Sequence, residues 1–242
     1  MNSMRFHGKV LWKFHNLAMI EHVYRRACLA LSAQHVYITS GDSEILTYMK
    51  SKGANVIKSN RTHNDGTSRA AEAVEKLKYN YVAVLQADEI LIDPLHLIKL
   101  FDSVKTDEEI KYFNLVTNLN SDVELNDSNV VKCALNNKNE ILFIFRQSPS
   151  KDASFKIFSK IMGTIIFERN SLFALTSSPD TPLQVANSTE QLKILELGYT
   201  LKAVNVESSY PSINIEDDIK IVQNFVKDNE RQKIIMSEYV EL

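Results

Sequence analysis

The chain has 242 residues, and 44% of them are hydrophobic, which is enough for the core of one α/β domain or of two small ones. The formal net charge is −2, so no basic excess points to nucleic acid or to an anionic membrane as the partner. No apolar run approaches the roughly 18 residues that a membrane span needs, and the first residues lack the apolar core of a secretory signal. We therefore expect a cytoplasmic protein that binds neither nucleic acid nor membrane.

The first half of the chain alternates between strand-like and helix-like segments. Apolar residues at helical spacing predict a helix over residues 16–33, and the nearly continuous apolar run at 81–85 predicts a strand covered on both faces. Further strands are expected at 35–39 and 54–58, and further helices at 43–52, 67–78 and 94–101. This alternation indicates an α/β fold, a mostly parallel sheet with helices on both faces.

After residue 105 the pattern is less regular. Strands are expected at 112–116, 130–135, 141–145, 160–167 and 199–206, with helices at 189–197 and 216–225. The two cysteines, Cys28 and Cys133, fall in helix-like and strand-like segments, so we expect reduced core residues rather than a disulfide. No internal repeat or linker is present, and one domain is the simplest interpretation.

Polar residues follow two of the predicted parallel strands, where ligands of such sheets bind. Asp88 comes after the strand at 81–85, and the loop "THNDGTSR" follows the strand at 54–58. Gly66 in this loop allows close approach of a ligand, and Thr67 or Ser68 could cap the next helix while leaving N–H groups free for an anion or a base edge. Taken alone, each feature is typical of a solvated turn or an ordinary helix cap.

A third segment, "SMRFHGK", places the cations Arg5 and Lys9 on either side of a glycine, as a phosphate-binding loop would. Cations and amide donors suit a triphosphate, and the carboxylate of Asp88 suits the Mg²⁺ that such a nucleotide carries. The combination favours a nucleotide site over three unrelated surface turns.

These segments resemble one known family, the cytidylyltransferases that activate 3-deoxy-D-manno-octulosonate (KDO) with CTP. "SMRFHGKVL" is similar to the family's S-T-R-L-P-G-K-P-L, and "MIEHVYRRA" to its M-I-x-H-V-x-x-R-A. "HNDGTSRAAEAVEKL" is similar to H-x-S-G-T-D-R-x-A-E-V, and "VLQADEILIDP" to V-x-Q-G-D-E-P-x-I-x-P. Weaker similarity continues through "ILFIFRQSP", "TEQLKILELGYTLKAV" and "INIEDDIKIV".

The resemblance implies a three-layer α/β/α sandwich of the nucleotide-diphospho-sugar transferase type and a homodimer. It implies transfer of CMP from CTP to KDO or a related 3-deoxy sugar acid, with release of pyrophosphate, for lipopolysaccharide or capsule sugar biosynthesis. The single domain of residues 1–242 would then have a nucleotide-binding half at 1–105 and a sugar-binding and dimerisation half at 106–242.

The resemblance also assigns roles by position. Arg5, Lys9 and Asp88 would be catalytic, with Asp88 and Asn214 at the Mg²⁺. Nucleotide binding would fall to Ser3, Gly66, Thr67, Arg69 and Gln86, and sugar binding to Arg146, Gln184 and Gln191.

The sequence departs from the family pattern in three places. The family's opening I-I-P-A-R strand has no counterpart before Ser3, which we expect to reflect a late start codon or a truncated form. Asn214 stands where the family has a second metal-binding carboxylate, and it is a weaker ligand for a hard cation. Ile161 and Ile165 stand where the family's sugar site has His and Tyr.

Two alternatives follow from these departures. A non-catalytic paralogue would keep the fold and nucleotide binding while losing turnover. A glycosyltransferase on a similar scaffold would need an Asp-x-Asp pair after a strand, whereas "QADE" has its two carboxylates adjacent.

Overall fold

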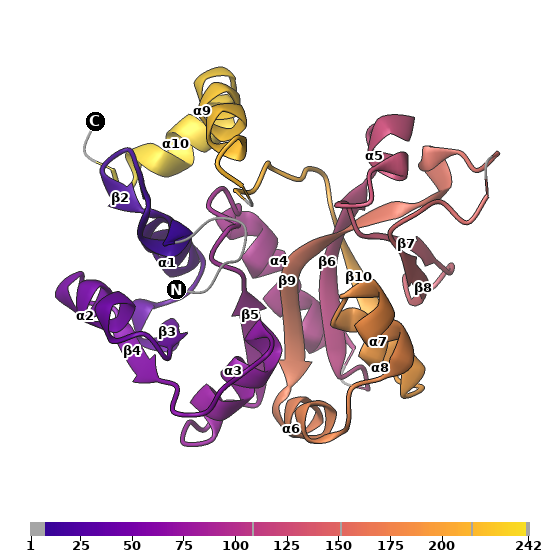
Figure 1. The fold of residues 1–242 in the computed structure, drawn as a ribbon, viewed down its shortest axis with the longest axis horizontal. Coiled ribbons are helices and arrows are strands. Elements are labelled where there is room, and N and C mark those ends of the chain that lie inside the picture. The colour runs from indigo at the N-terminus through magenta and orange to yellow at the C-terminus, as the bar shows by residue number, and fades with distance from the viewer. Residues whose placement is uncertain (1–7, 108, 151, 214, 241–242) are drawn as a thin grey trace. The chain divides into compact units, whose positions relative to one another are not determined.

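The computed structural model describes residues 8–107, 109–150, 152–213 and 215–240. The chain divides into two compact units, each built from segments distant in sequence (Figure 1). Unit 1 comprises Met1–Thr62, Leu85–Ile98 and Tyr210–Leu242, and unit 2 comprises His63–Val84 and Lys99–Ser209. The predicted division into halves at residue 105 stays a prediction.

Unit 1 is an α/β unit around a short parallel strand pair. Its elements are η1 (Lys9–Leu11), β1 (Lys13–Phe14), β2 (Leu17–Ala18), α1 (Met19–Ala30), η2 (Ala33–His35), β3 (Tyr37–Ser40), α2 (Ser43–Ser51), β4 (Asn55–Lys58), α9 (Asp218–Asp228) and α10 (Glu230–Ser237). β3 and β4 pair in parallel with α2 as the crossover, as the sequence predicts. Gly53, at φ 80°, takes the left-handed conformation that ends α2.

The helix predicted from residue 16 begins later, at Met19. Residues 13–18 form the antiparallel pair β1–β2 instead, with His15 and Asn16 in the turn at φ 45° and 64°. Two consecutive positive φ angles are typical of the tight turns that join antiparallel strands. The apolar face of α1 is buried as expected, with Met19, Val23 and Ala27 in the core.

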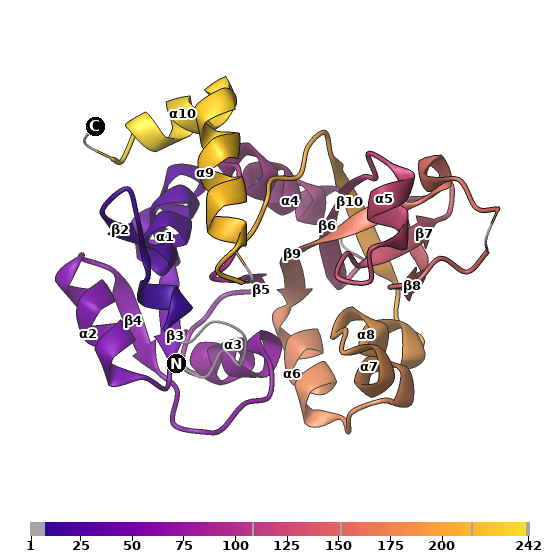
Figure 2. The ribbon, with the colours of Figure 1, turned by 45° about the horizontal axis from the view of Figure 1, so that its top comes forward.

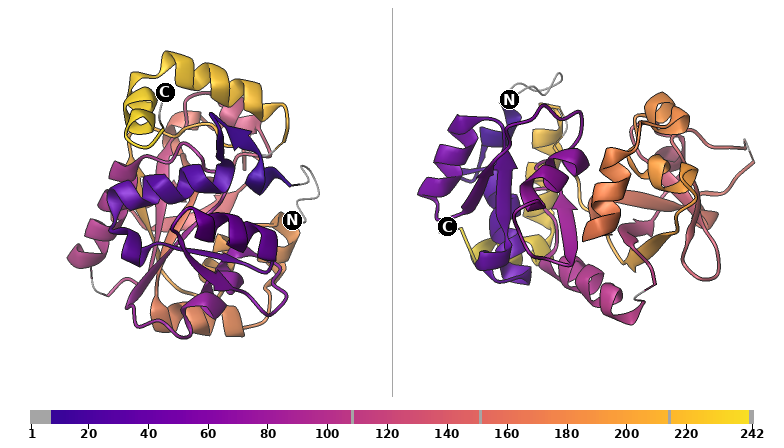
Figure 3. Two further views of the ribbon diagram at one scale, coloured as in Figure 1. Left: turned by 90° about the vertical axis from the view of Figure 1, so that its left-hand side faces the viewer. Right: turned by 90° about the horizontal axis from the view of Figure 1, so that it is seen from below.

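The first and last segments of the chain share one core in unit 1. Phe14 and Val23 pack in a cluster with Ile90, Val222 and Met236, so the N-terminal, central and C-terminal pieces are held by a single apolar contact surface. Figure 3 shows the indigo and yellow segments of this unit side by side.

Unit 2 is built around a six-stranded sheet. Its elements are α3 (Gly66–Val74), β6 (Tyr112–Asn118), α5 (Asp122–Asn126), β7 (Lys132–Leu135), β8 (Ile141–Phe145), η3 (Phe155–Ile157), β9 (Ser159–Glu168), α6 (Arg169–Ser177), α7 (Pro182–Asn187), α8 (Gln191–Glu196) and β10 (Leu201–Val206). β5 (Tyr81–Leu85) and α4 (Pro94–Thr106) each run from one unit into the other along the chain.

The six-stranded sheet is mixed, which refines the expected mostly parallel sheet. The strand order is β10-β6-β9-β7-β8, and β5 also pairs with β9. β10 and β6 are parallel, whereas β6–β9, β7–β9 and β7–β8 are antiparallel. β7 and β8 are joined by only five residues, too few for the crossover that parallel strands need.

Helices cover both faces of this sheet, so unit 2 has the expected three layers. Tyr112 and Val116 of β6 face a cluster that includes Ala71 of α3, Leu172 of α6 and Leu192 of α8. Phe113 and Leu115, which alternate with them, face Leu100 and Val104 of α4. Figure 2 shows α7 and α8 lying together in this unit.

No helix among the described residues is long and apolar enough to cross a membrane. Cys28 is half-buried and Cys133 is buried, and both are free thiols, as predicted.

A buried ion pair joins α10 to the start of α4 in unit 1. Arg231 donates two hydrogen bonds of 2.8 Å to the carboxylate of Asp93, whose side chain is only 5% exposed. Burial by itself would raise the pKa of Asp93, but the Arg231 hydrogen bonds, the Leu95 N–H and the nearby positive charge together outweigh it and lower this pKa. The ion pair therefore stabilises the folded protein at pH values above the ordinary pKa of an aspartate. This stabilisation is lost as the pH falls through the lowered pKa of Asp93 in the folded protein.

We expect Arg231→Met to lower the free energy of unfolding at pH 7 by about 2 kcal/mol, because the Asp93 charge stays buried without its partner. The loss is smaller than for a fully buried pair, since Arg231 is 42% exposed. Urea unfolding at pH 7 and about pH 3 checks this, because the difference from the wild type should shrink in acid. An equal difference at both pH values would contradict the assignment, and Lys105→Met, on an exposed pair, is the control.

Candidate functional site

In unit 1, an ion pair stands at the end of β5. Lys9 Nζ lies 2.9 Å from Asp88 Oδ2, and the two side chains are 13% and 18% exposed. Lys9 Nζ also donates to the carbonyl of Ile213 at 3.2 Å, and the Ile213 N–H donates to the Asp88 carbonyl at 3.2 Å. The N-terminal, central and C-terminal segments of unit 1 thus meet through Lys9, Asp88 and the Ile213 backbone.

The local backbone explains how Lys9 reaches this position. Gly8 has φ 71°, a left-handed conformation that favours glycine, and its carbonyl accepts the Leu11 N–H in the turn η1. Two of the predicted groups, Lys9 and Asp88, are therefore together. Gln86 follows β5 in the same unit and is exposed, whereas Ser3, Arg5 and Asn214 lie outside the described residues.

The donor set at Asp88 fits Mg²⁺ held mainly by its substrate. Among the described residues, no group of three or more His, Cys, Asp or Glu side chains is placed to enclose a metal. Mg²⁺ is commonly bound through one or two carboxylates together with substrate phosphates, so a single carboxylate such as Asp88 is sufficient.

In unit 2, the loop before α3 is organised by carboxylates. Asp65 is the N-cap residue, and its Oδ1 accepts the Ser68 N–H at 2.7 Å. Thr67 Oγ1 donates to Glu190 Oε2 at 2.5 Å, and the backbone N–H groups of Gly66 and Thr67 lie near enough to this carboxylate to lower its pKa. The expectation that Thr67 or Ser68 caps the helix is therefore wrong, because Asp65 is the N-cap residue and binds the Ser68 N–H.

Glu190 holds this position against an electrostatic cost. Burial raises the pKa of Glu190 and the nearby Asp65 charge raises it further, whereas the bonds from Thr67 and Gly66 lower it by less. Sequence reasoning missed both carboxylates. Asp65 had a local signal, since Asp three residues before Ser is a typical N-cap spacing, but Glu190 is 123 residues from Thr67.

Two features of this loop leave room for a ligand. A Cβ added at Gly66 would meet only Val84 Cγ1, at 3.9 Å, so packing inside unit 2 does not require the glycine. Arg69 Nε is buried and has no hydrogen-bond partner among the described residues. A buried donor without an acceptor is costly, and a bound ligand would supply one.

The predicted sugar-binding residues also lie in unit 2, but two of them already have structural partners. Arg146 donates to the carbonyls of Asn187 and Ser188 at the end of α7. Gln184 forms the capping box of α7 with Thr181.

The third sugar-binding candidate, Gln191, begins α8. Its Nε2 donates to Oδ1 of the fully buried Asn114 at 3.2 Å. Asn114 in turn donates to the Met162 carbonyl on β9 at 2.9 Å.

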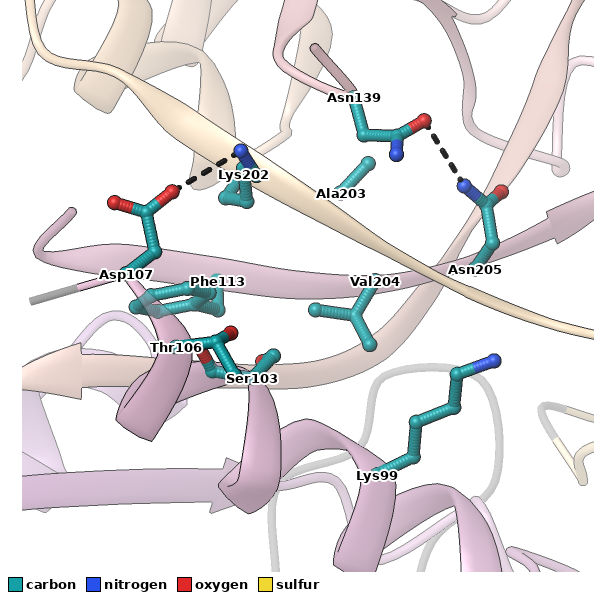
Figure 4. A pocket seen from close by; sticks show the side chains of 10 residues that line it. All are labelled: Lys99, Ser103, Thr106, Asp107, Phe113, Asn139, Lys202, Ala203, Val204 and Asn205. Carbon is teal, nitrogen blue, oxygen red and sulfur yellow. Dashed lines mark hydrogen bonds and ion pairs between the residues drawn. The ribbon is translucent and has the colours of Figure 1, made fainter.

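A cavity of about 340 Å³ lies on the α4 side of unit 2, and none of the predicted site residues lines it (Figure 4). Its floor is Phe113 and Val204, and its rim includes Lys99 and the Lys202–Asp107 ion pair. α3, in contrast, packs on the opposite face of the sheet. The candidate nucleotide loop and this cavity are therefore distinct features.

Comparison with known proteins gives relatives over nearly the whole chain. A mitochondrial 3-deoxy-manno-octulosonate cytidylyltransferase from Arabidopsis thaliana is 29% identical over 233 residues, covering 93% of this chain and 80% of that protein. An 8-amino-3,8-dideoxy-manno-octulosonate cytidylyltransferase from Shewanella pealeana is 30% identical over 227 residues, covering 91% of this chain and 93% of that protein.

Solved structures share the fold. CMP:2-keto-3-deoxy-manno-octonic acid synthetase complexed with CTP aligns with a TM-score of 0.86 at 23% identity, covering 93% of this chain and 94% of that one. The inositol-1-phosphate CTP transferase from T. maritima aligns with a TM-score of 0.66 at 12% identity, covering 97% of this chain and 89% of that one. The cytidylyltransferase family matches residues 1–228, and the chain belongs to this family.

Proposed function

We propose that this protein transfers CMP from CTP to 3-deoxy-D-manno-octulosonate or a closely related 3-deoxy sugar acid and releases pyrophosphate. The relatives named for this reaction align over nearly the whole chain, and one of them is named for an 8-amino sugar, so the sugar acid itself stays open. The product would be the activated sugar for lipopolysaccharide or capsule synthesis. The observation that carries the proposal is the Lys9–Asp88 pair at the end of β5.

In this reaction the anomeric hydroxyl of the sugar attacks the α-phosphate of CTP, and the bond from that phosphorus to the pyrophosphate oxygen breaks. Mg²⁺, bound by Asp88 and the nucleotide phosphates, would neutralise negative charge on the phosphates. Lys9 would contribute a second positive charge and orient the Asp88 carboxylate. Arg5, Ser3 and Asn214, outside the described residues, keep their assigned roles as part of this proposal.

In unit 2, the loop of Gly66, Thr67 and Arg69 would bind the cytidine part of CTP. Gln86, in unit 1, keeps its assigned nucleotide-binding role as part of this proposal. Support comes from the loose packing at Gly66, where a Cβ would meet only Val84 Cγ1 at 3.9 Å, and from Arg69 Nε, which has no partner among the described residues. Gln191 would face the sugar acid. Arg146 and Gln184 would act there by holding the α7–α8 segment in place, since their own polar groups are engaged.

The test is release of pyrophosphate from CTP and Mg²⁺ with a panel of 3-deoxy sugar acids. We expect turnover with at least one sugar, and a loss of at least about 100-fold in kcat/KM for Lys9→Met and for Asp88→Asn, because each variant removes a charge that acts on the phosphates. Asp88→Asn should also need more Mg²⁺ for half-maximal rate, since an amide is a weaker ligand.

Lys13→Met is the matched control, because Lys13 is an exposed lysine of the same unit and should leave kcat/KM unchanged. Wild-type protein that binds CTP but turns over no sugar acid would instead establish the non-catalytic paralogue. Turnover unaffected by Asp88→Asn would remove the proposed role of that carboxylate.

A homodimer is the proposed oligomer. Phe143 on β8 is 42% exposed and Ile157 on η3 is 67% exposed, and the Phe143 ring lies 6.4 Å from the ring of Phe158, the neighbour of Ile157. A second copy of the same chain would cover these apolar side chains with its own identical surface, as two-fold dimers do.

Light scattering coupled to size-exclusion chromatography should give twice the chain mass for the wild type. Ile157→Lys should shift the protein toward the monomer, because it places a charge in the buried contact. Leu95→Lys, at a residue of unit 1 that is 56% exposed, is the control and should not change the mass. A monomeric wild type at working concentrations contradicts the dimer.

A further inference from the structure

Three glutamates in unit 2 accept hydrogen bonds at the start of a helix in the same way. Glu168 accepts from the N–H groups of Asn170 and Ser171 and from the Ser171 hydroxyl, at the start of α6. Glu196 accepts from Thr181 Oγ1 and from the N–H groups of Leu183 and Gln184, at the start of α7. At the start of α3, Glu190 accepts the corresponding hydroxyl bond from Thr67 Oγ1, and the nearby N–H groups of Gly66 and Thr67 lower its pKa.

The three carboxylates differ in electrostatic balance. For Glu168 and Glu196, burial opposes ionisation, but the donated hydrogen bonds outweigh it and the pKa of each is lowered. For Glu190 burial dominates, Asp65 adds a like charge, and the pKa is raised. The contacts at Glu168 and Glu196 favour the charged form, whereas Glu190 is ionised at a cost in folding free energy.

Capping does not account for Glu190, because α3 already has an N-cap. The Asp65 side chain accepts the Ser68 N–H and provides the ordinary cap of this helix. The additional carboxylate binds the Thr67 hydroxyl in the first turn, beside the N–H groups of Gly66 and Thr67. These are the residues at which the proposed cytidine site requires a fixed backbone.

Glu190 also connects two parts of the proposed site. The next residue, Gln191, begins α8 and is bonded to the buried Asn114 of β6, so the backbone of Glu190 is anchored to the sheet. A rigidly placed carboxylate can hold a loop in one conformation, whereas a mobile one cannot.

We propose that Glu190 is a positioning residue that fixes the Gly66–Thr67 turn in the conformation that receives the cytidine part of CTP. The inference rests on the proposed function for what the turn binds, but the positioning itself is a property of unit 2. An anchored carboxylate bonded to the Thr67 side chain restricts the freedom of that turn, which lowers the entropy lost when a nucleotide binds.

Glu190→Gln is the test variant, because it keeps the shape but replaces one acceptor oxygen with an NH₂ group that faces the loop donors. We expect hydrogen exchange of the amides at residues 64–70 to become faster, and KM for CTP to rise about tenfold with kcat changed by less than about twofold. At pH 8 the melting temperature should stay level or rise, since the buried charge is gone.

Glu168→Gln is the matched control, because Glu168 makes the same kind of contact in the same unit at a helix without predicted site residues. It should lower the melting temperature at pH 8 and leave KM for CTP and the exchange at residues 64–70 unchanged. If the role of Glu190 is merely structural, Glu190→Gln and Glu168→Gln should change the melting temperature, KM for CTP and hydrogen exchange at residues 64–70 in the same way. That result would overturn the proposal.

Thr67→Val adds a second readout, because valine has nearly the same shape as threonine but lacks the hydroxyl that donates to Glu190. If Glu190 acts through Thr67, the effects of Glu190→Gln and Thr67→Val on KM should be less than additive in the double variant. Wild-type protein without turnover would refute the proposed function alone, because the exchange measurement still decides whether Glu190 fixes the loop. Unchanged exchange in Glu190→Gln refutes the positioning role whether or not the enzyme turns over.

Discussion

The ion pair between Lys9 and Asp88 is the interaction on which unit 1 depends. It joins the first described turn to the end of β5, and the bonds from both residues to Ile213 bring in the C-terminal segment. Both side chains are largely buried, so neither charge can be removed without leaving the other poorly solvated. The two charges therefore keep three distant stretches of chain together, and the proposed phosphate and metal site would be preorganised by the same contact.

The sequence predicted the parts of the fold that local pattern determines. The periodicity of Met19, Val23 and Ala27 located α1, and β3, α2 and β4 were found in order because β-branched runs and Gly53 mark their limits. The turn at His15 and Asn16 was missed, since nothing nearby in the sequence requires positive φ there. The mixed sheet of unit 2 was missed for a different reason: strand direction depends on connections and partners, which a pattern of apolar residues does not record.

The candidate site was predictable where its chemistry is carried by neighbours in sequence. Lys9 and Asp88 were each predicted from their own segments, and the structure brings them into contact. Glu190 was not predicted to bind Thr67, because a carboxylate that bonds to a loop 123 residues away has no local signature. Arg146 donates to the carbonyls of Asn187 and Ser188, contacts that its own segment does not indicate, and its predicted sugar contact stays a prediction.

Under the proposed function, sugar recognition would depend on which polar groups unit 2 offers. Ile161 and Ile165 of β9, which replace the His and Tyr of the family pattern, are buried in the apolar cluster beneath α3, α6 and α8 and cannot offer hydrogen bonds. Polar groups near this layer come instead from Gln191 and Asn114, already bonded to each other. A protein rejects the wrong sugar strongly when that sugar leaves polar atoms of the binding site without hydrogen-bond partners. A site that forms few hydrogen bonds to the sugar hydroxyls therefore discriminates weakly among sugars that differ by one hydroxyl. The acceptor range of this protein should therefore be governed more by the shape of the α7–α8 segment than by individual hydrogen bonds.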